Sequence, residues 1–143
     1  MPAYHAVYIS DIPNGESESK EGEPDWKPVR IFFGIRSFGT NAYVGRRAGD
    51  ELVEPHTEVD DSGTQHEELY FIVNGRARFT IEDEEVDAPA GTFIYVRDPA
   101  VKRSARADED DTVLLAFGGT PGEAFDVSPW ERKWEPKVAR VEG

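Results

Sequence analysis

The stretch HEELYFIVNGRARFTI, residues 66–81, decides the fold of this chain. Two runs rich in β-branched and aromatic residues flank Asn74 and Gly75, and Asn-Gly is a preferred pair for the two-residue turn of a β-hairpin. With such a turn, Tyr70 would lie opposite Phe79, and alternate residues would point to opposite faces. Both faces then carry apolar side chains, so we expect the hairpin to lie between two covered surfaces.

Short β-prone runs continue on both sides of this stretch, separated by turn residues at intervals of roughly 8 to 12 residues. This pattern favours an all-β sandwich or barrel over a parallel sheet covered by helices. The runs that we expect to form strands are VRIFFGIRSF (29–38), TNAYVG (40–45), GDELVEPHTE (49–58), TFIYV (92–96), KRSARA (102–107) and TVLLAF (112–117).

The two ends of the chain differ from its middle. Residues 6–9 form a short β-prone run, and residues 11–25 are rich in Gly, Pro, Ser and charge, which is typical of a mobile loop. Thr120 and Ser128 each precede a proline and a glutamate, the pattern of a helix start. We therefore expect one domain in three parts: an N-terminal strand and loop over 1–28, a barrel over 29–118, and short C-terminal helices over 119–143.

Composition narrows the classes of function. The 143 residues include 29 acidic residues against 16 Lys and Arg, a formal net charge of −13. Such a surface repels phosphate backbones and anionic lipids, so we expect no nucleic-acid partner and no membrane partner. The absence of cysteine excludes disulfides, thiolate metal sites and cysteine nucleophiles. The N-terminal residues lack the pattern of a signal peptide, which favours a cytoplasmic location.

Much of the acidic excess falls in two short runs, EDEE at 82–85 and DEDD at 108–111. Neither run has the glycine and the spaced glutamate of an EF-hand calcium loop. We interpret both runs as solvated β-turns.

The segment from Gly49 to Gly75 resembles the first motif of the cupin superfamily. That motif contains a Gly, then His-x-His, then a Glu, and a second Gly after six further residues. The equivalent residues here are Gly49, His56-x-Glu58, Glu68 and Gly75. The resemblance covers roughly residues 29–118 and implies an all-β, jelly-roll-like cupin barrel with a short C-terminal helical tail.

The second cupin motif, Pro-x-Gly followed after two residues by His, is present in weakened form. Here Pro99-x-Val101 is followed after two residues by Ser104. Metal-binding cupins hold their ion with the two His and the Glu of the first motif and the His of the second. Of those four ligands, this chain retains His56 and Glu68, so the metal motif is degenerate.

Two further side chains can compensate for the lost histidines. His56 and Glu58 alternate along one strand, as do His66 and Glu68 along the next, so each pair points to one side. If both pairs face the barrel interior, two imidazoles and two carboxylates converge, a donor set that suits Zn²⁺, Mn²⁺ or Fe²⁺. The alternative is that His66 lies in the loop at the barrel mouth and the carboxylates are solvated.

Other interior candidates follow from the same alternation. Tyr70 shares the face of Glu68, and Ser104 and Arg106 alternate on the strand after Pro99. Arg106 would neutralise an acidic ligand or pair with Glu68; the alternative is a solvated arginine at a strand end. The alternative for Tyr70 is a packing residue with a satisfied hydroxyl.

The resemblance implies a small-molecule-binding cupin. We expect an enzyme that acts on a small oxygenated or anionic metabolite, with His56 as metal ligand or general base and Glu68 as ligand or acid–base carboxylate. Tyr70 and Arg106 would orient the substrate. Oxygenases, isomerases and cyclases all use this fold, and the sequence does not choose among them. The alternative is a metal-free ligand-binding module or a partner subunit without catalysis.

An apolar stripe on the outside of the predicted barrel bears on oligomeric state. Leu69, Phe71 and Val73 would lie together there, and exposed stripes of this kind mark partner surfaces. We therefore expect a homodimer. The alternative is that residues 31–33 and the C-terminal helix cover the stripe within one chain.

Overall fold

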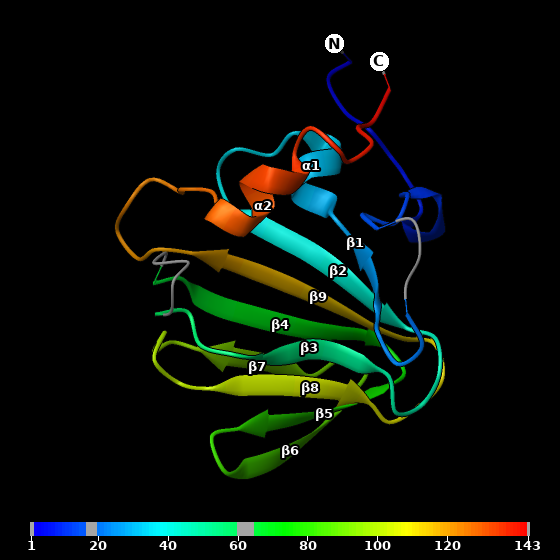
Figure 1. Cartoon of the computed structure of the whole chain (residues 1–143), viewed down its shortest axis with the longest axis vertical. Coiled ribbons are helices and arrows are strands. Elements are labelled where there is room, and N and C mark those ends of the chain that lie inside the picture. The colour runs from blue at the N-terminus through cyan, green and yellow to red at the C-terminus, as the bar shows by residue number, and fades with distance from the viewer. Residues whose placement is uncertain (1, 17–19, 60–64, 143) are drawn as a thin grey trace.

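The computed structural model describes residues 2–16, 20–59 and 65–142. Two antiparallel sheets face each other, one with strand order β1-β2-β9-β4-β7 and one with order β3-β8-β5-β6 (Figure 1). In chain order the elements are η1 (Ile9–Asp11), β1 (Asp25–Lys27), α1 (Val29–Phe33), β2 (Gly39–Gly45), β3 (Glu51–His56), β4 (Glu67–Asn74), β5 (Arg76–Ile81), β6 (Glu84–Pro89), β7 (Phe93–Val96), β8 (Arg103–Ala107), β9 (Thr112–Gly119) and α2 (Pro129–Trp134).

The core lies between the two sheets. Tyr70 and Ile72 of β4 and Ala77 and Phe79 of β5 are all buried, and the Tyr70 and Phe79 rings meet with centroids 5.3 Å apart. Removing an aromatic or large aliphatic side chain from water contributes roughly 1.5 to 3 kcal/mol. The interior position that the alternation predicts for Tyr70 and its partner Phe79 is confirmed.

The predicted hairpin turn at Asn74 and Gly75 is wrong, although both of its strands exist. β4 pairs with β7 and β9, whereas β5 pairs with β6 and β8, so these two residues connect one sheet to the other. Gly75 has φ 77°, and a Cβ there would lie 2.5 Å from Thr112 Oγ1. The Asn74 side chain donates to the Asp111 carbonyl at 2.9 Å. Gly75 suits this crossing because a glycine adopts the left-handed backbone without steric cost.

Residues 29–33 form α1, where the sequence predicts a strand. Gly34 ends this helix with φ 73°, and its backbone N–H bonds to the Arg30 and Ile31 carbonyls. α1 packs against β2, and Ile31 and Phe32 are buried. Tertiary packing has overridden the β propensity of these residues, as it often does for short apolar runs.

The remaining predicted elements have mixed outcomes. The strands expected at 40–45, 49–58, 92–96, 102–107 and 112–117 are confirmed as β2, β3, β7, β8 and β9, and the helix expected after Ser128 is confirmed as α2. No helix follows Thr120, where Gly122 adopts a left-handed φ of 72°.

Two further expectations need correction. The run 6–9 is irregular chain that leads into η1, and the predicted turn at 82–85 is shorter, since β6 begins at Glu84. The loop predicted at 11–25 includes residues 17–19, which lie outside the described residues.

The C-terminal helix α2 packs against β1 and β2 of the first sheet, and both chain ends lie at the same end of the molecule (Figure 1). Trp26 of β1 contacts Trp130 and Trp134 of α2, with ring centroids 5.5 and 5.6 Å away. Buried Arg30 pairs with Glu131 at 2.5 Å. These contacts place α2 beside the opening between the sheets. None of the helices in the described ranges has the length and apolar character needed to cross a membrane.

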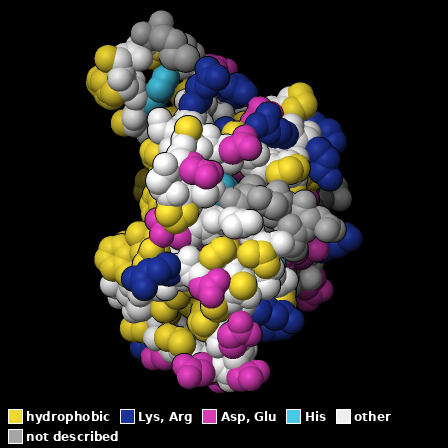
Figure 2. Space-filling view, turned by 90° about the vertical axis from the view of Figure 1, so that its left-hand side faces the viewer, with side chains coloured by type: hydrophobic (Ala, Val, Ile, Leu, Met, Phe, Trp, Pro, Cys, Tyr) yellow, Lys and Arg dark blue, Asp and Glu magenta, His cyan; other side chains and the backbone are white. Residues whose placement is uncertain are grey.

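The outer face of β4 and β7 is apolar and open. Val73, Phe93 and Tyr95 are 48%, 62% and 49% exposed, and Phe93 stacks on Phe71 with centroids 4.4 Å apart. Within the described residues this face is therefore left partly uncovered, and the homodimer stays a prediction. Acidic side chains gather at the lower end of the molecule in Figure 2, the end that β5 and β6 occupy in Figure 1.

Candidate functional site

A cavity of about 680 Å³ opens between the two sheets beside α2. Its walls come from β1, β2, β3, β4 and β9 and from the chain that leads into α2. His56, Glu58, His66, Glu68 and Tyr70 all line it. The cavity therefore contains every residue proposed as a metal ligand from the sequence.

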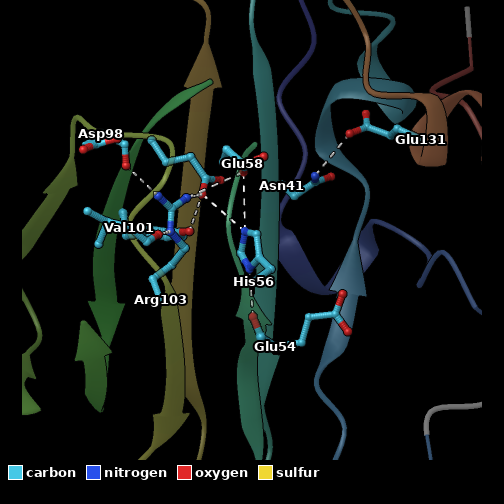
Figure 3. A network of polar contacts seen from close by, with 10 residues as sticks. Asn41, Glu54, His56, Glu58, Asp98, Val101, Arg103 and Glu131 are labelled. Atoms are coloured by element: carbon cyan, nitrogen blue, oxygen red, sulfur yellow. Dashed lines mark hydrogen bonds and ion pairs between the residues drawn. The ribbon is translucent and has the colours of Figure 1, made fainter. Parts of the chain in front are cut away.

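Three of these side chains converge. His56 ends β3, Glu58 follows two residues later, and Glu68 lies on β4; one ligand atom from each lies within 4.8 Å of the others. His56 Nε2 is 3.4 Å from Glu58 Oε1 and 3.5 Å from Glu68 Oε1. The other ring nitrogen, Nδ1, donates to the Glu54 carbonyl at 2.8 Å (Figure 3). That bond turns Nε2 toward the two carboxylates.

A buried arginine completes the cluster. Arg103 is 0% exposed, and its Nη1 lies 2.6 Å from Glu68 Oε1 and 3.8 Å from Glu58 Oε1. Its Nε and Nη2 donate to the Val101 and Asp98 carbonyls at 2.9 and 3.3 Å. A guanidinium stays charged in proteins, so these contacts hold a permanent cation against the two carboxylates (Figure 3).

The prediction that Arg106 faces the barrel interior is wrong, because Arg103 is the buried arginine of β8. On β8, Arg103, Ala105 and Ala107 are buried, so Arg106 lies on the opposite face. Arg106 is exposed, and its Nη1 donates to the Gly49 carbonyl at 3.4 Å. It does not line the cavity. The alanines at 105 and 107 are the sequence feature that indicates which face of β8 points inward, because small apolar residues suit the inner face of a narrow barrel.

Tyr70 holds Glu68 from a third direction. Its hydroxyl donates to Glu68 Oε1 at 2.5 Å, so one carboxylate oxygen accepts hydrogen bonds from both Tyr70 and Arg103. The Tyr70 side chain is almost fully buried. It therefore contributes both to the core and to the position of Glu68.

These contacts separate the proton affinities of the two carboxylates. Burial opposes ionisation of Glu68, but its hydrogen bonds with His56, Glu58 and Tyr70 outweigh burial and lower its pKa to about 2. Burial raises the pKa of Glu58 above its usual value. Glu58 is therefore the carboxylate in the cluster that accepts a proton most readily.

The imidazole of His56 is charged at neutral pH. Burial alone would lower its pKa, but hydrogen bonds to Glu58, to Glu68 and to the Glu54 carbonyl outweigh burial and raise the pKa to about 10. The cluster therefore contains two cations, His56 and Arg103, and two carboxylic groups.

His66, the fourth ligand proposed from the sequence, lies apart from this group. Its ring packs against Phe125 with centroids 5.5 Å apart, and burial lowers its pKa. In the described part of the chain, Nε2 of His66 is buried without a hydrogen-bond partner. The predicted set of two imidazoles and two carboxylates is thus reduced to His56, Glu58 and Glu68.

These three residues make contacts that a resident divalent metal would have to displace. The ligand oxygen of Glu68 already accepts hydrogen bonds from Tyr70 and Arg103. His56 would have to lose its proton to act as a ligand, and the nearby guanidinium would repel the ion. Arg103 thus supplies the positive charge that buried carboxylates require.

Comparison with solved structures identifies the fold. A cupin protein from Bacteroides fragilis superposes with a TM-score of 0.58 at 18% identity, over 90% of this chain and 93% of that one. A protein from Photorhabdus luminescens superposes with a TM-score of 0.60 at 15% identity, over 85% of this chain and 90% of that one. A putative sugar phosphate isomerase from Acidithiobacillus ferrooxidans gives 0.55 at 23% identity, over 66% of this chain and 58% of that chain.

No family model and no curated protein matches the sequence. The structural likeness nevertheless confirms the cupin barrel that the motif predicted. At these identities it establishes the fold alone, so the chemistry must be argued from the residues of the site.

Proposed function

We propose that this protein is a metal-free cupin enzyme that binds a small oxygenated metabolite in the cavity and catalyses proton transfer on it. The observation that carries the proposal is the contact of His56 Nε2 with Glu58 Oε1 at 3.4 Å, with Arg103 Nη1 held 2.6 Å from Glu68 Oε1. A charged proton donor and a carboxylate of raised pKa, in one cavity, form an acid–base pair.

Each residue has a distinct role in the proposed reaction. Glu58 takes a proton from a carbon next to a carbonyl group of the substrate. His56 donates its Nε2 proton to the carbonyl oxygen, so the product of the first step is a neutral enol. Return of the two protons, with the carbon proton delivered to a different carbon or face, yields an isomer and restores both residues. Arg103 and Tyr70 keep Glu68 ionised, and Glu68 in turn stabilises the His56 cation.

Deuterium exchange tests this proposal. The protein is incubated in D₂O with a panel of small hydroxy and keto compounds, and NMR detects deuterium at carbons next to a carbonyl group. We expect exchange on at least one compound with the wild type and none with Glu58→Gln. Glu84→Gln, on exposed β6, is the matched control and should exchange normally. Equal exchange by Glu58→Gln and the wild type would exclude the role of Glu58.

A metal centre is the second candidate, because three donor side chains meet within 4.8 Å. Elemental analysis of protein purified without a metal-binding tag decides between the two. A stoichiometric metal that disappears in His56→Ala would favour the metal centre. Metal-free protein with a stable fold would favour acid–base catalysis or a ligand-binding module.

A further inference from the structure

The cavity has an excess of carboxylates that the acid–base cluster does not use. The glutamates in its described lining are Glu16, Glu23, Glu51, Glu54, Glu58, Glu68 and Glu131. Glu58 and Glu68 are balanced by His56 and Arg103, and Glu131 by Arg30. The other four form no ion pair within residues 2–16, 20–59 and 65–142. Lys20 is the one lysine of the described lining, so this part of the cavity carries net negative charge.

Aromatic rings line the same cavity. Trp26, Tyr43, Phe125 and Trp130 all contribute to its wall. Trp26 is held in place by its ring contacts with α2 and by a hydrogen bond from its Nε1 to Asn41 Oδ1 at 3.0 Å. Aromatic faces attract cations within about 6 Å, and indole does so most strongly. The rings and the carboxylates therefore favour the same kind of ligand.

His66 adds a hydrogen-bond acceptor to this lining. It is 6% exposed, and one of its ring nitrogens bonds to the backbone of Asp126. Since Nε2 has no partner among the described residues, that bond involves Nδ1. A neutral imidazole that donates from Nδ1 leaves Nε2 with a lone pair. An unpaired buried acceptor is costly, and a ligand N–H group would satisfy it.

We infer that the ligand of this cavity carries a protonated amine, which the free carboxylates, the aromatic rings and His66 bind, and that anionic ligands are excluded. The inference rests on the proposed small-molecule function and names its substrate class. It favours an amine-bearing ligand over the anionic metabolite considered from the sequence. The oxygenated part of the same ligand would face His56.

Three probes of equal chain length test the charge preference. Titration calorimetry compares 1,4-diaminobutane, 1,4-butanediol and succinate, which are cationic, neutral and anionic. We expect saturable binding of the diamine, at least about tenfold weaker binding of the diol and no binding of succinate. Added salt should weaken the binding of the diamine, because the carboxylates are partly exposed and salt screens their charge. Equal heats for the three probes, or no diamine binding, would overturn the inference.

Substitutions assign the binding to the cavity. Glu51→Gln and Glu54→Gln, whose side chains lie at the surface of the cavity, should together weaken diamine binding about tenfold. Glu84→Gln combined with Glu85→Gln removes the same two charges outside the cavity and should leave binding unchanged. An equal loss of diamine affinity in the cavity variant and in the control variant would show a nonspecific response to net charge and would contradict the inference.

The outcomes for selectivity and for catalysis remain separable. Glu58→Gln should lose deuterium exchange and retain diamine binding. Exchange that persists in Glu51→Gln/Glu54→Gln with unchanged diamine affinity would refute the amine preference alone. Deuterium exchange that persists in every variant, including Glu58→Gln, would refute the catalytic proposal alone.

Discussion

Nη1 of Arg103 lies 2.6 Å from Oε1 of Glu68, in a part of the barrel where the arginine is completely buried. Glu68 is the carboxylate that the cupin motif assigns to a metal. In this chain its counterion is a covalent part of β8. The relationship explains how the fold tolerates the loss of the motif histidines: the buried negative charge is still compensated.

Removing this counterion should destabilise the protein. We expect Arg103→Met to lower the free energy of unfolding by about 3 to 5 kcal/mol, because it leaves a buried carboxylate without its partner. Urea denaturation measures the change. Arg106→Met, on the exposed face of the same strand, is the matched control and should alter stability little. Similar losses in both variants would contradict the assignment of Arg103.

Replacing the guanidinium by an imidazole should create a metal site. Arg103→His removes the competing cation and supplies a second nitrogen ligand near Glu68, so we expect it to bind Zn²⁺ or Mn²⁺ more tightly than the wild type. Calorimetry with each metal measures the affinity. Ser104→His restores the histidine at the motif position and should not gain affinity, since Arg103 rather than Ser104 points to Glu68. A gain in Ser104→His alone would reverse this prediction.

The charged cluster should give stability a defined pH dependence. The pKa of His56 is raised from 6.5 to about 10, so its contribution is complete below pH 6.5 and is lost as pH rises toward 10. The pKa of Glu68 is lowered from 4.5 to about 2, so its contribution is complete above pH 4.5 and is lost as pH falls toward 2. The raised pKa of Glu58 works against the contribution of Glu68 on the acid side.

Urea midpoints measured across pH test this dependence. We expect a plateau between about pH 4.5 and 6.5 with a decline on each side. His56→Gln should flatten the decline on the alkaline side and also reduce the decline on the acid side, because His56 helps to lower the pKa of Glu68. An alkaline decline that is the same in His56→Gln and the wild type would mean that another group causes it.

The exposed apolar face of β4 and β7 should mediate self-association. We expect the wild type to be a homodimer in sedimentation equilibrium and Phe93→Glu to be a monomer, because the substitution places a charge within the apolar surface. Phe38→Glu, at another exposed phenylalanine, is the control and should remain dimeric. A monomeric wild type would remove this interpretation of the apolar stripe.

The site shows which functional residues a local sequence pattern can identify. His56, Glu58 and Glu68 follow from the motif, because their spacing along two strands is a local property. Arg103 does not follow from it. Two arginines occur in the run 102–107, and a period of two assigns them to opposite faces without saying which face is inside. The alanines at 105 and 107 indicate which face is inside, and the pairing of β8 with β3 and β5 places Arg103 on that face.

The sequence by itself determined the β-rich composition, most of the strand positions and the inward direction of Tyr70 and Phe79, since propensity and alternation act between near neighbours. Only the tertiary structure decided that Asn74 and Gly75 cross between sheets, that residues 29–33 form a helix, and that Arg103 is the counterion of Glu68. Those three features depend on contacts with Thr112, with β2 and with β4, and Thr112 and β4 are distant in sequence from their partners Gly75 and Arg103. A chain makes these contacts only when its sheets pack, so a local pattern alone does not determine them.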